Sequence, residues 1–263
     1  MNKNELLRDL LLPDGDSSHS LSIAFAARSG SGKTTLLTSL VNDARKMESF
    51  KDTRFIYVGI KRDSMFDAPA VSNVADMWKQ LQKNPIVNFF PNDPAFYEVD
   101  IDEIIESVFD NSESSEGGFV IMLDDINVVK GFDSRGSPSP AVKKLAIAGR
   151  SMGIRGVFIT HRIANLPRIM NGNTSALIML SISEMDIDYG KKIFGMDFTT
   201  LIPELKDYKW AYVDLINENI LQFNPVGGDS DWTRSNHWLH HGYVDSSNVD
   251  VYWYALPIQE TIQ

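Results

Sequence analysis

The stretch from Ala27 to Thr35 places small residues, a lysine and hydroxyl residues close together, as Ala-Arg-Ser-Gly-Ser-Gly-Lys-Thr-Thr. This spacing is typical of a phosphate-binding loop, in which glycines let the backbone approach an anion and N–H groups at the start of a helix point at it. Lys33 is expected to reach the β- and γ-phosphates of a nucleotide, and Thr34 to hold Mg²⁺. The predicted nucleotide-binding residues are Ala27, Arg28, Ser29, Gly30, Ser31, Gly32, Lys33, Thr34 and Thr35.

The flanking residues supply the strand and the helix that such a loop requires. Residues 21–26 form a short apolar run that is typical of a buried strand. After the loop, apolar residues recur at helical spacing, at Leu36, Leu37, Leu40, Val41 and Ala44. The loop is therefore expected to join a buried strand to an amphipathic helix.

A second candidate is the apolar run Phe119–Leu123, which is followed by Asp124 and Asp125. A buried strand would deliver both carboxylates to its carboxyl end, where ligands bind in open α/β sheets. We expect Asp124 to bind Mg²⁺ through water and Asp125 to polarise the attacking water as the catalytic base. The alternative is a buried strand that ends in two solvated aspartates.

A third candidate is the segment 149–162. Thr160 and His161 end a predicted strand, from which either side chain could sense a γ-phosphate. Arg150, near the end of the preceding predicted helix, could stabilise the phosphoryl group bound by a neighbouring subunit, as an arginine finger does. The alternatives are an arginine that complements a helix dipole and an ordinary polar residue at a strand end.

Taken together, the blocks A-R-S-G-S-G-K-T, V-I-M-L-D-D and G-R-S-M-G-I-R-G-V-F-I-T-H-R resemble the FtsK–HerA superfamily of DNA-pumping ATPases, over about residues 20–223. That family writes the third block as G-R-x-x-G-I-h-x-x-x-A-T-Q-R, and Arg150 precedes His161 by the family's spacing of eleven residues. The pair Asp124-Asp125 is similar to genome-packaging ATPases of poxviruses, other large DNA viruses and tailless membrane-containing phages. The chain departs from the family at Ala27, where glycine is usual, and at His161, which replaces the sensor glutamine.

The resemblance implies an ATPase that uses ATP and Mg²⁺, forms a homo-oligomeric ring (a hexamer or pentamer) and moves double-stranded DNA into a preformed viral capsid. Lys33, Asp125, Arg150 and His161 would be its catalytic residues; whether Arg150 or Arg155 is the finger stays open. A capsid vertex or membrane-associated packaging proteins would be partners, in the host cytoplasm or within the virion. Two alternatives remain: a cellular or plasmid DNA-transfer motor, and a nucleotide-switched assembly or scaffold protein.

The distribution of charge supports a DNA motor independently. The chain of 263 residues has a net charge of −10, which argues against a surface that coats nucleic acid non-specifically. Residues 128–168, however, contain eight basic side chains and one acidic one. A Gly/Ser/Pro-rich loop begins this segment, and we expect its Lys130 and Arg135 to hold DNA phosphates. The alternative is a solvated loop in a segment whose arginines serve the ATP site.

The pattern of elements predicts an α/β fold of the P-loop NTPase class, with a mostly parallel central sheet covered by helices on both faces. The additional-strand type is expected because some ninety residues between Lys33 and Asp124 leave room for an inserted strand–helix unit. Further strands are predicted at 54–60, 86–90, 156–160, 176–182 and 210–215, and helices at 71–81, 100–109 (with Asp100 and Glu103 as a capping box) and 139–153.

Three regions are predicted: an N-terminal arm (1–20), the ATPase domain (21–224) and an aromatic-rich C-terminal appendage (225–263). No apolar run is long enough for a membrane span, and no signal peptide is expected. The absence of cysteine excludes disulfides and thiolate metal sites. The appendage holds three closely spaced histidines without an obvious fourth ligand, so we do not expect a zinc site there.

Overall fold

The computed structural model describes residues 2–13, 22–28, 30–60, 66–93, 97–113, 117–124, 138–166, 169, 172–181, 183–196, 198, 209–223 and 234–239. The helices are α1 (Lys3–Leu11), α2 (Lys33–Ala44), α3 (Val74–Leu81), α4 (Tyr97–Ser112), α5 (Pro140–Ala148) and α7 (Glu184–Phe194), with 3₁₀ turns η1 (Glu48–Phe50), η4 (Arg150–Met152) and η5 (Ile163–Asn165). The strands are β1 (Ser22–Ala27), β2 (Arg54–Val58), β3 (Ala70–Val71), β4 (Ile86–Phe89), β5 (Phe119–Leu123), β6 (Ile154–Thr160), β7 (Thr174–Leu180), β8 (Trp210–Asp214), β9 (Asn219–Phe223) and β10 (Arg234–Leu239).

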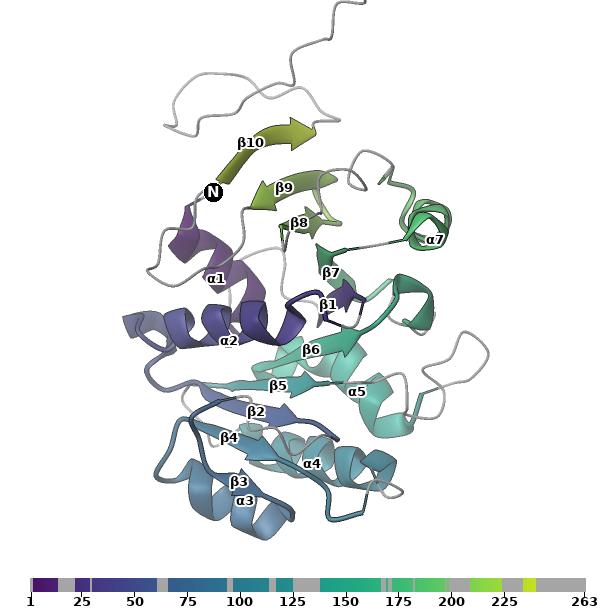
Figure 1. Cartoon of the computed structure of the whole chain (residues 1–263). Coiled ribbons are helices and arrows are strands. Elements are labelled where there is room, and N and C mark those ends of the chain that lie inside the picture. The colour runs from purple at the N-terminus through teal and green to yellow at the C-terminus, as the bar shows by residue number, and fades with distance from the viewer. Residues whose placement is uncertain are drawn as a thin grey trace, which may run out of the picture.

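These strands form one sheet in the order β10-β9-β8-β7-β1-β6-β5-β2-β4-β3 (Figure 1). The pairs from β7 to β3 are parallel, whereas β8, β9 and β10 join the β7 edge as antiparallel strands. Every residue of β5, β6 and β7 is buried. Strands buried on both faces need helices on both faces, and the expected mostly parallel α/β sheet is therefore confirmed.

The two faces of the sheet carry separate helices and separate apolar clusters. α1 and α2 pack on one face, and α3, α4, α5 and α7 pack on the other. Along β5 the side chains alternate between the two clusters: Val120 and Met122 lie on the face of α2, and Ile121 and Leu123 on the face of α4. This alternation decides which face receives the residue that follows β5.

The additional strand is confirmed, but it comes from a different part of the chain than the residue count suggested. β6 lies between β1 and β5 in the sheet, and it follows Asp124 in the sequence. The residues between Lys33 and Asp124 instead supply β2, β4 and β3 on the other side of β5. The inserted segment therefore extends the sheet outward from β5.

Two predicted helix starts were wrong. α4 begins at Tyr97, so Asp100 lies inside the helix and forms no capping box; burial, together with the charge of Glu103, raises the pKa of Asp100. Val71 pairs with Phe89 in β3, and α3 starts only at Val74, after Asn73. The Asn73 side chain accepts the Asp76 N–H at 2.8 Å, and that N-cap fixes the start of α3.

Within the segment predicted as an N-terminal arm, residues Lys3–Leu11 fold as α1 on the sheet. Asn2 and Glu5 form a capping box, and the apolar side of the helix is buried, through Leu6, Leu7, Leu10 and Leu11. At the far end, the Arg155 guanidinium donates to the Leu12 carbonyl at 2.8 Å. In the part of the chain that the structure describes, these leucines belong to the same apolar cluster as α2.

Within the predicted appendage, β10 pairs antiparallel with β9 and so continues the sheet. The remaining residues of 225–263, including His240 and His241, lie outside the described residues. The division into arm, ATPase domain and appendage stays a prediction. None of the described helices is long and apolar enough to cross a membrane.

Because Leu7 is fully buried, we expect Leu7→Ala to lower the free energy of unfolding by about 2–5 kcal/mol, as cavity-forming substitutions do. Arg8→Ala, at the neighbouring exposed position, should change it by no more than about 0.5 kcal/mol. Urea unfolding followed by circular dichroism measures both. An equally small effect for the two variants would mean that α1 is a detachable arm.

Candidate nucleotide site

The phosphate-binding loop runs from the end of β1 to the start of α2. Gly30 and Gly32 adopt φ values of 76° and 87°, in the left-handed region that glycine enters without strain. Gly32 is also the N-cap of α2. It has no side chain that could cap the helix, so no Gly32 side chain covers the backbone N–H groups of the first turn. A Cβ at Gly30 would meet nothing within 4 Å, so the backbone there is open to a ligand.

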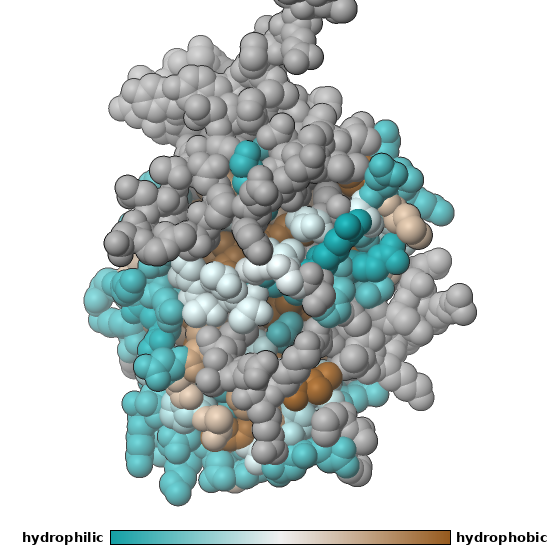
Figure 2. All heavy atoms as spheres, viewed as in Figure 1, coloured by the Kyte–Doolittle hydropathy of each residue, from teal (hydrophilic) through white to brown (hydrophobic). Residues whose placement is uncertain are grey.

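A single carbonyl oxygen organises the described part of this loop. The Arg28 carbonyl accepts the Ser31 N–H at 3.3 Å, the Ser31 hydroxyl at 2.6 Å and the Lys33 ammonium at 3.2 Å. Thr34 and Thr35 are exposed in the first turn of α2, while Ser29 lies outside the described residues. In Figure 2 the surface over α2 is near-neutral, between hydrophilic regions, in keeping with the hydroxyl side chains along that helix.

β6 brings His161 next to the phosphate-binding loop. β1 and β6 pair in parallel with Ala26 opposite Thr160, so the residues that follow both strands lie side by side. The Lys33 Nζ is 3.2 Å from the His161 Nδ1, which accepts this hydrogen bond when the imidazole carries its proton on Nε2. The predicted proximity of His161 to the phosphate-binding loop is thus observed, and its role as a sensor stays a prediction.

Asp124 follows β5 on the face of α2, as the alternation along that strand requires. Its Oδ2 accepts the Tyr57 hydroxyl at 2.6 Å, and its backbone carbonyl accepts the Tyr97 hydroxyl at 2.5 Å. Its N–H donates to the Val58 carbonyl at 2.9 Å, which ties it to β2. Sequence reasoning missed both tyrosines; the signal was a tyrosine within the apolar run 54–60, since a buried phenol needs a hydrogen-bond partner.

The chemistry of these groups fits a nucleotide with Mg²⁺. The Thr34 hydroxyl and the Asp124 carboxylate offer the oxygen ligands that Mg²⁺ prefers, and Mg²⁺ usually keeps several waters and takes further ligands from phosphates. Among the described residues no group of three or more His, Asp or Glu side chains could hold a metal ion alone. The donor set therefore suits a cation that arrives with a phosphate ligand.

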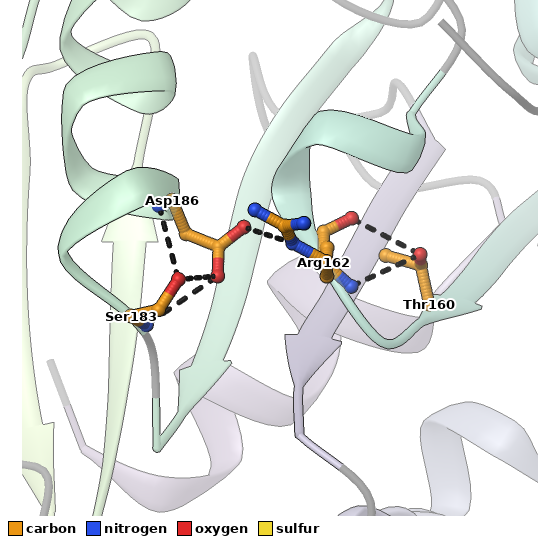
Figure 3. A network of polar contacts seen from close by, with 4 residues as sticks. All are labelled: Thr160, Arg162, Ser183 and Asp186. Atoms are coloured by element: carbon orange, nitrogen blue, oxygen red, sulfur yellow. Dashed lines mark hydrogen bonds and ion pairs between the residues drawn. The ribbon is translucent and has the colours of Figure 1, made fainter.

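A polar network fixes the tip of β6 to α7 (Figure 3). The Thr160 hydroxyl donates to the Arg162 carbonyl at 3.1 Å, and the Arg162 Nε lies 3.4 Å from Asp186 Oδ1. Asp186 is buried and accepts the Ser183 hydroxyl at 2.5 Å within the capping box of α7. This network surrounds His161 on both sides in sequence and restrains the turn that carries it.

Arg150 and Arg155 lie at the opposite end of β6 from His161. β6 has seven residues, and at about 3.3 Å per residue it separates its two ends by about 20 Å. Arg150 is exposed in η4, before the strand starts, and so lies far from the phosphate-binding loop of its own chain. Arg155 is 1% exposed, and its burial lowers its pKa to about 10 although Asp9 opposes the shift. A finger reaching a neighbouring subunit must be accessible, which favours Arg150 over Arg155.

Several basic residues of the segment 128–168 have structural partners. Lys144 pairs with Glu106 at 2.5 Å and lies 4.4 Å from the centre of the Phe109 ring, which joins α5 to α4. Arg155 is buried under α1, and Arg162 pairs with Asp186. Part of the positive charge of this segment therefore lies on side chains that hold elements of the fold together. Asp125, Lys130 and Arg135 lie outside the described residues.

Neither a protein-family model nor a curated protein sequence matches the chain. Solved structures do. The genome packaging NTPase B204 from Sulfolobus turreted icosahedral virus 2, in complex with ATP-gammaS, aligns with a TM-score of 0.63 at 17% identity, over 81% of this chain and 98% of B204. The DNA-packaging ATPase B204 from Sulfolobus turreted icosahedral virus gives 0.63 at 18% identity, over 79% of this chain and 98% of that one.

A more distant match is the cytoplasmic domain of the type VII secretion ATPase EccC from Thermomonospora curvata, with a TM-score of 0.55 at 15% identity, over 83% of this chain and 28% of that one. The likeness to these NTPases and ATPases shows that the chain shares their fold, in keeping with the expected P-loop ATPase architecture. At these identities the likeness establishes the shared architecture, and the chemistry has to be argued from the residues of this chain.

Lys33→Ala should abolish ATP hydrolysis, because charge that develops on the γ-phosphate would lose its cation. The matched control is Lys46→Ala, which removes an exposed lysine just beyond the other end of α2 and should leave turnover unchanged. Phosphate release measured for both variants tests this. Near-normal turnover of Lys33→Ala would show that this loop does not bind the reacting phosphate.

Proposed function

We propose that this protein is an ATP-driven motor that moves double-stranded DNA, and that its cargo is a viral genome entering a preformed capsid. The observation that carries the proposal is the contact between Lys33 and His161 at the carboxyl edge of β1 and β6, with Asp124 at the same edge after the neighbouring strand β5. That arrangement occurs in a fold that matches B204, named as a genome packaging NTPase, along almost all of its length.

Each group of the site has a separate task in the proposed hydrolysis. Lys33 neutralises charge on the transferred phosphoryl group, and Thr34 with Asp124 holds the Mg²⁺, which supplies further neutralisation when bound. Asp125 polarises the water that attacks the γ-phosphorus, and the bond from that phosphorus to the ADP oxygen breaks. His161, beside Lys33, responds to the presence of the γ-phosphate and passes this on through the turn that Arg162 and Asp186 restrain.

The position of Arg150 supports a ring. An exposed arginine about 20 Å of strand away from its own phosphate-binding loop can act on a nucleotide only if that nucleotide belongs to another subunit. In a closed ring every subunit presents the same surface to its neighbour, so one arginine per chain completes every site. A pentamer and a hexamer both satisfy this geometry.

The experiment that tests the proposed function is ATP turnover with and without duplex DNA. A DNA motor hydrolyses ATP faster when DNA is bound. The control is Lys33→Ala, which should show no turnover in either condition and so excludes a contaminating ATPase. Hydrolysis that duplex DNA leaves unchanged, together with nucleotide-dependent assembly, would instead support the scaffold alternative. Absence of any hydrolysis in the assembled wild-type protein would contradict the proposal.

Arg150→Ala should reduce turnover about 10³-fold or more and leave ATP affinity nearly intact, because a finger acts mainly in the transition state. Mixing this variant with Lys33→Ala subunits, each inactive alone, should recover part of the activity. The recovery arises at interfaces where an intact loop meets an intact arginine. If rings shown to contain both variants recover no activity, Arg150 does not act on a neighbouring subunit's nucleotide and its role is structural.

The double variant Lys130→Ala/Arg135→Ala should bind duplex DNA more weakly for all sequences, with basal ATP turnover preserved. The dependence of affinity on salt should become shallower by about one unit for each DNA phosphate that the variant no longer neutralises. Lys46→Ala/Lys51→Ala, which removes two exposed lysines elsewhere, is the control for net charge. If the first double variant keeps its affinity for DNA and its full stimulation of ATP turnover by DNA, this loop does not contact DNA.

A further inference from the structure

The side chain of Asp124 is held by a residue from a strand that carries no motif. The Tyr57 hydroxyl donates to Asp124 Oδ2 at 2.6 Å, a short distance that is usual for a hydroxyl bound to a charged oxygen. Tyr57 is 4% exposed, whereas Asp124 is half-buried at the edge of the sheet. The contact therefore reaches from the interior to the part of the site where a metal ion would lie.

The fold brings Tyr57 to this position through strand pairing. β2 and β5 run parallel with Tyr57 opposite Met122, so the phenol needs to extend only along the strand direction to reach the residue after β5. Two aromatic rings hold it on the way: Phe66 and Phe90 make edge contacts with Tyr57 at centroid distances of 5.9 and 6.2 Å. These contacts fix the ring, and the hydroxyl is then presented in one direction.

Gly59 leaves the space that this orientation needs. It stands two residues after Tyr57, and a Cβ built on it would lie 2.7 Å from the Tyr57 hydroxyl oxygen and 2.9 Å from its ring. Real Cβ atoms do not approach other atoms so closely, so any larger residue at 59 would displace the phenol. The path of the hydroxyl toward Asp124 thus depends on a glycine.

We propose that Tyr57 is a positioning residue for the metal-binding carboxylate. By donating to one oxygen, it fixes the rotation of the Asp124 carboxylate and so the direction in which that carboxylate faces the water shell of the Mg²⁺. Tyr97 complements it by holding the backbone carbonyl of Asp124 from α4. This inference rests on the proposed function, because it assigns a role within the same nucleotide site.

Tyr57→Phe keeps the ring and its packing and removes only the hydroxyl. We expect it to raise the Mg²⁺ concentration for half-maximal ATP hydrolysis by about three- to tenfold, since one hydrogen bond to a charged group is worth an effect of at least this size. Affinity for ATP measured without Mg²⁺ should stay within about twofold. The matched control is Tyr212→Phe, which removes another buried tyrosine hydroxyl on the same face of the sheet and should leave the Mg²⁺ dependence unchanged.

Gly59→Ala tests the same inference without removing the hydroxyl. It should raise the half-maximal Mg²⁺ concentration in the same direction as Tyr57→Phe, because it moves the phenol away from Asp124. The combined variant Tyr57→Phe/Gly59→Ala should be little worse than either single variant, since both act through one hydrogen bond. Independent structural damage would instead lower thermal stability without changing the Mg²⁺ dependence.

The outcomes separate this inference from the proposed function. A wild-type protein that does not hydrolyse ATP contradicts the function; Mg²⁺-dependent binding of ATP-gammaS, measured by calorimetry on the same variants, then decides the role of Tyr57. Wild-type Mg²⁺ dependence in both Tyr57→Phe and Gly59→Ala overturns the positioning role while the function stands. A wild-type protein whose nucleotide binding ignores Mg²⁺ overturns both.

Discussion

Parallel pairing of β1, β5 and β6 is the constraint on which the site depends. In a parallel sheet all carboxyl ends meet at one edge, so residues that are far apart in the chain become neighbours once the strands are in register. The pairing of Ala26 with Thr160 puts His161 beside Lys33, and the position of β5 next to β6 places Asp124 one strand further on. A slip of one residue in β6 would turn its buried side chains to the wrong faces and remove His161 from Lys33.

The elements inserted between the two phosphate-site motifs support the carboxylate rather than separate the motifs. β2 supplies Tyr57 and α4 supplies Tyr97, and both hydroxyls bond to Asp124. α4 is in turn joined to α5 by Lys144 and Glu106. β2 and α4 therefore contribute to the site indirectly, by fixing the direction of one side chain.

Much of this arrangement could be predicted from the sequence, because the signals for it are local. Three features can each be recognised within about a dozen residues: the phosphate-binding loop, the apolar run before Asp124 and the strand before His161. The order of strands could not be derived from chain length, since the insertion before Asp124 was compatible with either side of β5. The burial of α1 was missed because Leu6 to Leu12 is too short to show a helical period clearly. Tyr57 was missed because only a long-range contact gives its hydroxyl a partner.

β6 carries groups at both of its ends. Arg150 precedes it, the Arg155 guanidinium ties its first residues to the end of α1, and His161 follows its last residue beside Lys33. All seven residues of the strand are buried, and the strand is paired with β1 on one side and β5 on the other, so its two ends are held at a fixed separation. In a ring of the kind proposed, a small tilt of the sheet caused by the nucleotide at one end of this strand would change the reach of the arginine at the other. Successive subunits would then hydrolyse ATP in sequence, because the change at one site would be passed mechanically to the next without a flexible segment between them.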